Sequence, residues 1–404
     1  MYYLSCYLYH ADSGVFLARV SGPEGVMMHK QTRILFTIIG LITLLGGLLP
    51  AQSAVMGQSE PPYLIYFPVI NKSDTQPPAY YSTTWYFTTD MLKVTNGKRN
   101  IYYKGVQAGN LTAPPGRQDQ LVLLHFGRPR TDTNQVGTRI YFDTSGGLTS
   151  TNDIIIYTKE FINGFMVGAL ANNDTVSKLE LGVGTSNLNY DYYESKVCKG
   201  YFCTTTEAYN HGKAWALMID NLNQWVIAQG YASRVSVSGA NDIELAWNTA
   251  NITHAWVRGF DDYDQGKYIF YNFGACEGCD TVINLSKPPD PYKKLTGDWT
   301  PAKVYYSAWE APPAWPIPEI YTQSGTLANQ WANISKVGVM LGKGPMYFFS
   351  PLSQYQACQG SGDPLCAVMG NTPQQAWLQL YTALNKRPET AQNYIPYMTD
   401  IKWP

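Results

Sequence analysis

The stretch Arg234-Val-Ser-Val-Ser-Gly-Ala-Asn-Asp-Ile-Glu244 decides the predicted fold. Its alternating β-branched and small residues predict a strand, in which successive side chains point to opposite faces. The valines then lie on an apolar face, which we expect to contact helices. Asp242 and Glu244 lie together on the other face, at the carboxyl end of the strand, where barrel enzymes place their catalytic groups.

On both sides of this stretch, β-rich runs alternate with longer runs of helical periodicity, which is typical of βα units and a parallel sheet. The predicted strands are residues 121–126, 179–184, 234–244, 268–273, 303–309, 317–321, 346–349 and 397–403. The predicted helices are residues 152–171, 208–229, 252–260, 327–337 and 372–385. The first helix is expected to be capped by Thr151 or Asn152, and the second to be closed by Gly230.

About eight strands favour an α/β fold with an irregular (β/α)8, TIM-like barrel. The irregularity is expected between Trp309 and Ile317, because the Pro-rich link there leaves no room for a helix between two parallel strands.

The composition excludes one class of partner and is compatible with another. The 404 residues have a net charge of −1, so nothing indicates a nucleic-acid-binding surface. Aromatic residues make up 14% of the chain, and rings with polar edges suit surfaces that are half apolar and half wet, such as sugar-binding grooves. An aromatic-rich core explains the same composition equally well.

Residues 27–54 have the pattern of a signal peptide, with a basic start, an apolar run from Ile34 to Leu49, and small residues up to Ala54. The run is shorter than the roughly 20 residues of a bilayer span, so we expect cleavage and no stable membrane span. An uncleaved anchor is the alternative. Residues 1–26 are then a mis-assigned upstream segment, 55–80 a Pro-rich linker, and 81–404 one barrel domain of a secreted or cell-surface protein.

Six cysteines follow the signal in three close pairs, which are Cys198/Cys203, Cys276/Cys279 and Cys358/Cys366. An even number of cysteines in an exported chain usually forms disulfides, so we expect three local loop disulfides. The Cys-Glu-Gly-Cys spacing at 276–279 also fits a redox dithiol or half a zinc site, but no second ligand pair accompanies it.

Further candidate residues are predicted at the same end of the barrel. Glycoside hydrolysis usually needs a second carboxylate across the scissile bond, or a substrate amide in its place. Glu319 is the preferred candidate because it lies near a predicted strand end, and Glu310 is the weaker one. The candidate substrate-binding residues are His125, Trp247, Asn272, Trp309, Tyr321 and Gln354. Core packing, loop capping and ordinary hydrogen bonding are the structural alternatives for these residues.

Three segments share a pattern with known proteins: Gly239-Ala-Asn-Asp-Ile-Glu-Leu-Ala-Trp-Asn248, Tyr271-Asn-Phe-Gly274 with Cys279, and Pro318-Glu-Ile-Tyr321 with Gln330-Trp331. Together they resemble a group of secreted bacterial glycoside-hydrolase-like barrels, over most of residues 119–403. The Asp-x-Glu strand end is more distantly similar to the family 25 muramidases, where such a pair serves hydrolysis of the peptidoglycan glycan.

The resemblance implies that Glu244 is the general acid/base and Asp242 its supporting carboxylate. The chain departs from the muramidase pattern at the end of the predicted first strand, where Leu124-His125-Phe126 stands in place of an aspartate.

The predicted function is hydrolysis of a polysaccharide, with cell-wall glycan as the leading substrate. Two neighbouring carboxylates disfavour each other's ionisation, so one of them can keep its proton and act as a general acid. The alternative is a non-catalytic carbohydrate-binding or cell-surface protein, since one barrel hosts many functions. A third carboxylate facing Asp242 and Glu244 would favour the enzyme. The sequence has no serine-hydrolase elbow, phosphate loop or zinc helix, and we expect neither a metal nor another cofactor.

Overall fold

The computed structural model describes most of the chain from residue 76 onward. The described ranges are 76–88, 92, 97–112, 117–132, 135–141, 147–359 and 364–402. All of them belong to the second of two units, which comprise residues 1–67 and 68–404. The expected upstream segment, signal peptide and most of the Pro-rich linker lie outside the described residues.

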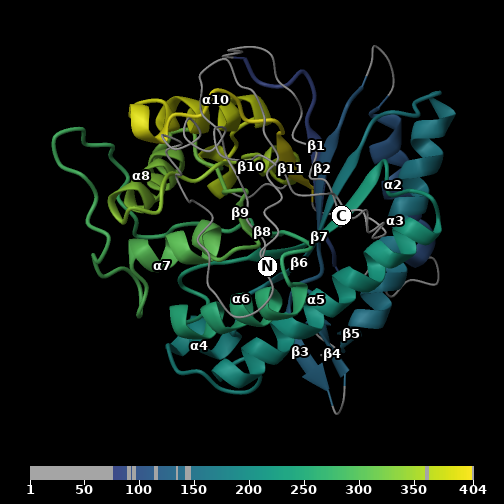
Figure 1. Ribbon diagram of the computed structural model, residues 1–404, viewed down its shortest axis with the longest axis horizontal. Coiled ribbons are helices and arrows are strands. Elements are labelled where there is room, and N and C mark those ends of the chain that lie inside the picture. The colour runs from purple at the N-terminus through teal and green to yellow at the C-terminus, as the bar shows by residue number, and fades with distance from the viewer. Residues whose placement is uncertain are drawn as a thin grey trace, which may run out of the picture. The chain divides into compact units, whose positions relative to one another are not determined.

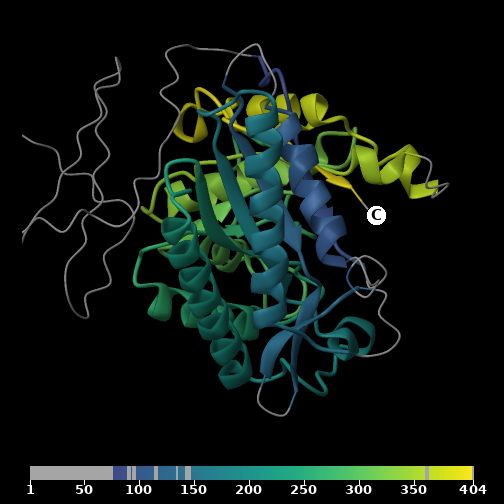
Figure 2. The ribbon, with the colours of Figure 1, turned by 90° about the vertical axis from the view of Figure 1, so that its right-hand side faces the viewer.

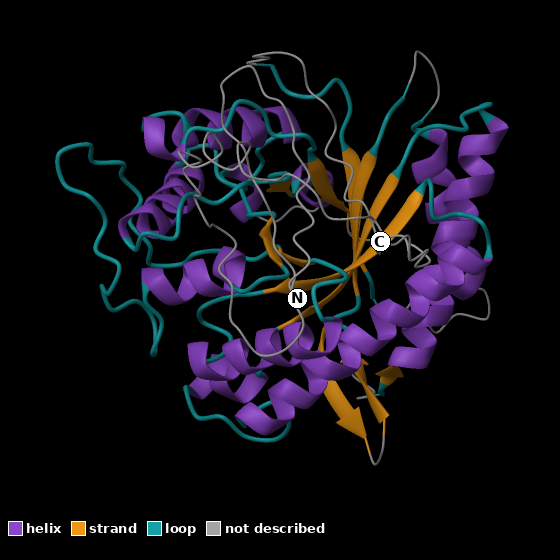
Figure 3. Cartoon of the chain, viewed as in Figure 1, coloured by secondary structure: helices purple, strands orange, loops and turns teal. Residues whose placement is uncertain are grey.

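Eight parallel strands form the central sheet, and helices surround it (Figures 1 and 3). In spatial order the strands are β10 (Leu352–Ser353), β11 (Thr399–Lys402), β1 (Ser82–Tyr86), β2 (Gln120–His125), β6 (Leu179–Ser186), β7 (Val235–Asp242), β8 (Phe270–Asn272) and β9 (Ala314–Pro316). Neighbouring strands pair in parallel throughout this sheet. Parallel pairing requires crossover connections, and these are mostly helical here.

The two edges of the sheet meet just beyond β9. Glu319 forms an isolated parallel bridge with Leu352 of β10. The Ile320 N–H donates to the Leu352 carbonyl at 2.8 Å, and the Leu352 N–H donates to the Pro318 carbonyl at 2.8 Å. This contact closes an irregular TIM-like barrel, so the predicted α/β fold is confirmed.

Small residues on β6 and β7 allow close packing on both faces of these strands. A Cβ atom at Gly182 would meet Leu123 and Tyr271 inside the barrel, whereas one at Gly239 would meet the ring of Phe260 in the helix layer. The strand that contains Gly239 therefore alternates between the two faces as its sequence predicts.

The principal helices are α2 (Gly97–Asn110), α3 (Thr151–Ala171), α4 (Tyr190–Ser195), α5 (Thr205–Ala228), α6 (Ala250–Asp264), α7 (Pro301–Tyr305), α8 (Thr326–Met340), α9 (Tyr355–Cys358) and α10 (Pro373–Leu384). Helix α3 begins after Ser150, whose side chain forms a capping box with Asp153. The predicted caps at Thr151 or Asn152 are therefore off by one or two residues. Helix α5 ends as predicted at Gly230, which has a φ of 74°.

Helices α2 and α3 run side by side along one flank of the barrel (Figure 2). Among the described residues, α3 alone is long and apolar enough to cross a membrane by length and composition. It packs closely against α2, because a Cβ at Gly164 would lie 2.0 Å from the Tyr102 carbonyl oxygen.

A small antiparallel sheet is inserted between β2 and α3. It consists of β3 (Arg128–Asp132), β4 (Gln135–Arg139) and β5 (Thr149–Ser150). The chain re-enters the barrel at Tyr141, which forms a parallel bridge with Thr88 just beyond β1. The β3–β4 hairpin thus begins at the carboxyl end of β2 and returns to the carboxyl end of β1, before the chain continues to β5.

The first barrel strand is β1, which the sequence analysis did not identify. The predicted first strand, residues 121–126, is the second strand, β2. The departure from the muramidase pattern therefore concerns the end of β2, not of β1.

Residues 303–309 are helical, so the predicted strand there is wrong. They belong to α7 and to the π-helix that follows, η1 (Tyr306–Glu310). Thr300 caps this helix by accepting a hydrogen bond from the Lys303 N–H, and Pro301 occupies its first turn. These start signals override the β propensity of the valine and tyrosines. The Pro-rich stretch from Trp309 to Ile317 consequently contains the short connection from η1 to β9, which is an ordinary helix-to-strand connection.

Residues 346–349 contain no strand. The Gln392 side chain bonds both the N–H and the carbonyl of Phe348, at 2.9 and 2.8 Å, and so occupies groups that a strand ladder would use. Strand β10 follows instead at Leu352. Strand β9 precedes the predicted 317–321 segment, within which Glu319 contributes only the closing bridge.

All three cysteine pairs form the expected local disulfides, with sequence separations of five, three and eight between partners. The Cys276–Cys279 pair is therefore a disulfide here, in the loop that follows β8. These bonds fix individual loops and do not link distant elements.

Candidate functional site

Three carboxylates meet at the carboxyl ends of the strands. Asp242 is the last residue of β7, Glu244 follows two residues later, and Glu319 lies at the closing bridge. One oxygen from each side chain lies within 4.8 Å of the other two. The structure thus brings together the three residues that the sequence analysis proposed as catalytic.

The backbone of Glu244 is held by Asn187, in the loop after β6. The Asn187 amide donates to the Glu244 carbonyl at 3.0 Å and accepts from the Glu244 N–H at 3.1 Å. The Asn187 amide also donates to the Thr253 hydroxyl of α6 at 3.1 Å. The Glu244 side chain accepts the Ala275 N–H at 3.0 Å. These contacts extend strand-like pairing past the end of β7 and position the carboxylate.

Asp242 is supported by two side chains from β1 and β2. The Tyr86 hydroxyl donates to Asp242 Oδ2 at 3.2 Å, and His125 Nε2 lies 3.3 Å from the same oxygen. Because the Gly127 N–H donates to His125 Nδ1 at 3.0 Å, the proton of the neutral ring resides on Nε2 and faces Asp242. That contact is close but poorly aligned for a hydrogen bond. In the described part of the chain, Asp242 Oδ1 has no partner.

Glu319 is held from its own segment. The Tyr321 hydroxyl donates to Glu319 Oε1 at 2.7 Å, and the Glu319 backbone forms the bridge that closes the barrel. Glu319 keeps some exposure to solvent, whereas Asp242 and Glu244 are 2% and 6% exposed. The open side of the cluster is therefore at Glu319.

Burial raises the pKa of all three carboxyl groups. The charges of Glu319 and Asp242 raise the pKa of Glu244 further, and the charge of Asp242 raises the pKa of Glu319. Hydrogen bonds oppose these shifts, from Tyr86 at Asp242, from the Ala275 N–H at Glu244, and from Tyr321 and Glu244 at Glu319. Burial lowers the pKa of His125 to about 3, so its ring is neutral and contributes no compensating charge. The cluster therefore retains protons at neutral pH, as a general acid requires.

The same three carboxylate oxygens are the group in the described chain best placed to share a hard divalent cation. His125 would not join them as a ligand, because its Nε2 carries the proton. The protein groups that contact the three carboxylates are hydrogen-bond donors. Such donors are compatible with these side chains whether or not a cation is bound.

The remaining predicted site residues divide into two groups. Trp247 and Gln354 lie in the segments that follow β7 and β10, at the same end of the barrel, and both are partly exposed. Asn272 is buried, with its amide directed at the Ser307 carbonyl of η1 at 3.4 Å. Trp309 lies in η1, before β9, where its ring contacts Trp315 at 4.7 Å. Asn272 and Trp309 are therefore not brought to the carboxylates.

The sequence analysis missed the aromatic wall of the site. Tyr86 packs 4.4 Å from the His125 ring, and Tyr141 and Phe273 lie 5.0 and 5.3 Å from it. The alternating run at residues 82–86 is a sequence signal that could have revealed Tyr86. Tyr141 arrives through the inserted sheet, and nothing in its local sequence indicates this.

Comparison of the chain with protein-family models, with curated proteins and with solved structures finds no match.

Proposed function

We propose that this protein is a secreted glycoside hydrolase that cleaves a polysaccharide, with cell-wall glycan as the leading substrate. The observation that carries the proposal is the meeting of Asp242, Glu244 and Glu319, whose oxygens lie within 4.8 Å of one another. A third carboxylate opposite Asp242 and Glu244 is the feature that distinguishes the enzyme from a carbohydrate-binding barrel. The sequence resemblance to glycoside-hydrolase-like barrels and muramidases is independent support.

In this proposal Glu244 donates its proton to the glycosidic oxygen as the bond to the anomeric carbon breaks. Tyr86 and His125 hold Asp242 beside Glu244, and a charge on Asp242 raises the pKa of Glu244 and so favours the return of a proton to it. Glu319 stabilises or attacks the anomeric carbon, unless a substrate amide takes that part. Water then adds at the anomeric carbon, displaces the Glu319 carboxylate if it has bonded there, and gives up a proton to Glu244, so bonds and protons balance over the cycle.

The spacing of the carboxylates supports retention of configuration. Retaining enzymes separate their two carboxyl groups by about 5–5.5 Å, and inverting enzymes by about 6.5–9.5 Å. Oxygens within 4.8 Å of one another lie nearer the retaining separation than the inverting one.

The test is release of reducing sugar from peptidoglycan and from a panel of soluble polysaccharides. We expect Glu244→Gln to lower kcat by about 10²–10⁴, because it removes the transferable proton and keeps the shape. Glu180→Gln is the matched control. Glu180 is also an acid of raised pKa beside Ser236, but it lies near the amino end of β6.

Full activity in Glu244→Gln would refute the acid/base assignment. If wild type and both variants bind glycan without turnover, the assignment changes from an enzyme to a carbohydrate-binding protein.

A further inference from the structure

A hairpin rich in arginine begins and ends beside the carboxylate site. Strand β3 starts at Arg128, three residues after His125, and β4 ends at Arg139, two residues before Tyr141. His125 and Tyr141 are in ring contact, with centroids 5.0 Å apart. The base of the hairpin, and not its tip, therefore lies next to the site.

Arg128 and Arg139 are directly opposite each other in the antiparallel pair, and Arg130 opposes Gly137. Arg128 and Arg130 share one face of β3, because side chains two residues apart point the same way. Like charges that face each other across a strand pair destabilise the sheet. A local loss of stability of this kind is typical of a functional surface.

The arginine face is the face directed at the site. In the extended chain from Arg139 to Tyr141, these two side chains lie on the same side. The Tyr141 ring on that side reaches Tyr86 and His125. Arg139, and Arg128 opposite it, therefore border the side of the barrel mouth that Tyr141 lines.

A second element confines Arg128 from the neighbouring loop. The Arg128 guanidinium lies 5.2 Å from the ring centroid of Tyr190, the first residue of α4. A cation held over a tyrosine face in this way keeps its charge available in a fixed orientation.

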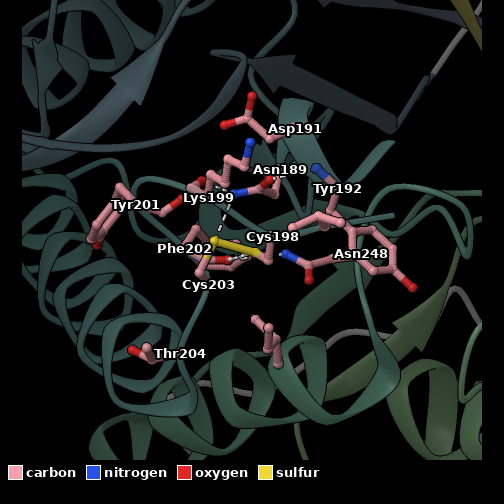
Figure 4. The surroundings of a disulfide bond; sticks show 12 residues. Asn189, Asp191, Tyr192, Cys198, Lys199, Tyr201, Phe202, Cys203, Thr204 and Asn248 are labelled. Atoms are coloured by element: carbon pink, nitrogen blue, oxygen red, sulfur yellow. Dashed lines mark hydrogen bonds between the residues drawn. A yellow bond between two sulfur atoms is a disulfide. The ribbon is translucent and has the colours of Figure 1, made fainter. Parts of the chain in front are cut away.

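Helix α4 is itself held in place by the Cys198–Cys203 loop (Figure 4). The Asn189 side chain caps α4 and donates to the carbonyls of Lys199 and Tyr201, each at 3.0 Å. The ring that orders Arg128 is thus fixed to a disulfide-closed loop.

Arg128 is charged, and the Asp191 carboxylate of α4 acts on it from beyond ion-pair distance. Burial and the charges of Arg139 and Arg130 lower the pKa of Arg128, but a guanidinium stays protonated at any physiological pH. Within the described residues, no carboxylate forms an ion pair with Arg128. An anionic ligand would relieve the repulsion between the arginines.

We propose that Arg128 and Arg139, together with Tyr190, form an anion subsite beside the carboxylates. The inference rests on the proposed function and narrows its substrate to a glycan that carries a carboxylate or phosphate group near the scissile bond. Guanidinium groups match both anions with paired N–H donors. The subsite would also offset the repulsion between such a glycan and the three acids.

The test compares binding of three sugars that differ at C6, namely glucose, glucuronate and glucose 6-phosphate, to the purified protein by calorimetry. We expect the two anionic sugars to bind at least about tenfold more tightly than glucose at low salt, which corresponds to ~1.4 kcal/mol. The preference should weaken as salt rises. Equal affinity for all three sugars would overturn the inference without any variant.

The double variant Arg128→Gln/Arg139→Gln should bind the three sugars equally, whereas Arg99→Gln, on the exposed side of α2, should keep the preference. An unchanged preference in the double variant would also overturn the inference. Arg128→Lys/Arg139→Lys keeps the charge and guards against misfolding. This variant should retain phosphate binding better than carboxylate binding if the natural group is a carboxylate recognised by the guanidinium fork.

The proposed hydrolysis and the anion subsite fail separately. If Glu244→Gln and wild type both lack turnover but prefer anionic sugars through Arg128 and Arg139, the subsite stands and the enzyme assignment falls. If acidic and neutral glycans are hydrolysed equally well, the enzyme assignment stands and the subsite falls.

Discussion

The two sides of the barrel differ in how they are built. Strands β2, β6 and β7 are six, eight and eight residues long, and long helices α3, α5 and α6 cover them. Strands β8, β9 and β10 have only three, three and two residues, and the barrel closes there through a single bridge. Asp242 and Glu244 come from the long-strand side, and Glu319 comes from the short-strand side. The site therefore depends on both the most and the least extensively paired parts of the sheet.

We expect the two sides of the barrel to affect different properties of the protein. The long-strand side should set the global free energy of unfolding, because its strands and helices bury most of their backbone against each other. The short-strand side should mainly set the position of Glu319, because few backbone bonds fix it. Variants on each side can test whether stability and site geometry separate in this way.

The largest expected effect is at the α2–α3 contact of the long-strand side. In Gly164→Ala, the new Cβ would lie 2.0 Å from the Tyr102 carbonyl oxygen, so the two helices must separate. We expect a loss of about 3 kcal/mol in the free energy of unfolding, which outweighs the roughly 1 kcal/mol that alanine gains in a helix. Urea unfolding measures it.

Val167→Ala on the exposed side of α3 is the control and should change stability by about 0.5 kcal/mol or less. A stable Gly164→Ala protein would mean that this helix contact does not govern the long-strand side.

The next effect is a fall in stability as pH rises. The folded state holds protons on Asp242, Glu244 and Glu319 more tightly than the unfolded chain, so their contribution is lost from about pH 4 upward through the raised pKa values. Each unit of pKa shift corresponds to ~1.4 kcal/mol. We expect Glu244→Gln to flatten the decline in urea titrations, most clearly above the ordinary histidine pKa of about 6.5.

Glu160→Gln, on the surface of α3, should leave that decline unchanged. Between about pH 4 and pH 6.5 the buried histidines oppose this decline, because burial lowers the pKa of His125 to about 3 and of His211 and His254 to about 4, and the unfolded chain binds those protons first. If the free energy of unfolding falls as steeply with pH in Glu244→Gln as in wild type, the carboxylates are not the groups that hold the extra protons in the folded state.

A moderate effect is expected where the long-strand side positions Glu244. Asn187→Ala removes both hydrogen bonds to the Glu244 backbone and leaves those buried groups unpaired. We expect a loss of about 2 kcal/mol and a fall in kcat that exceeds any change in KM. Asn329→Ala, which removes exposed hydrogen bonds to the Thr281 carbonyl and from the Lys386 ammonium, should do neither. Normal kcat in Asn187→Ala would mean that Glu244 is positioned by its side-chain contacts alone.

The smallest stability effect is expected on the short-strand side. Tyr321→Phe removes the hydrogen bond to Glu319 and should cost about 1 kcal/mol. Because that bond lowers the pKa of Glu319, its loss should move the pH profile of activity toward higher pH. Tyr193→Phe, an exposed tyrosine of α4, is the control. A stability loss as large as that of Gly164→Ala would remove the proposed distinction between the two sides.

The sequence predicted the long-strand side well and the short-strand side poorly. Alternation in residues 234–244 and helical periodicity in α3 and α5 extend over enough residues to identify each element. Strand β10 has two residues, and β9 is followed by prolines, so neither produces a pattern. The π-helix η1 was mistaken for a strand because local β propensity is weaker than the Thr300 cap and Pro301 start signal.

The sequence by itself determined the α/β class, the disulfide pairing and the Asp-x-Glu strand end, because each depends on residues close together in the chain. Only the tertiary structure decided that Glu319 joins Asp242 and Glu244, that Tyr86 and His125 support Asp242, and that the arginine hairpin borders the site. These juxtapositions follow from barrel closure and from the inserted sheet, which bring together strand ends separated by tens to hundreds of residues and leave no periodic signal in the sequence.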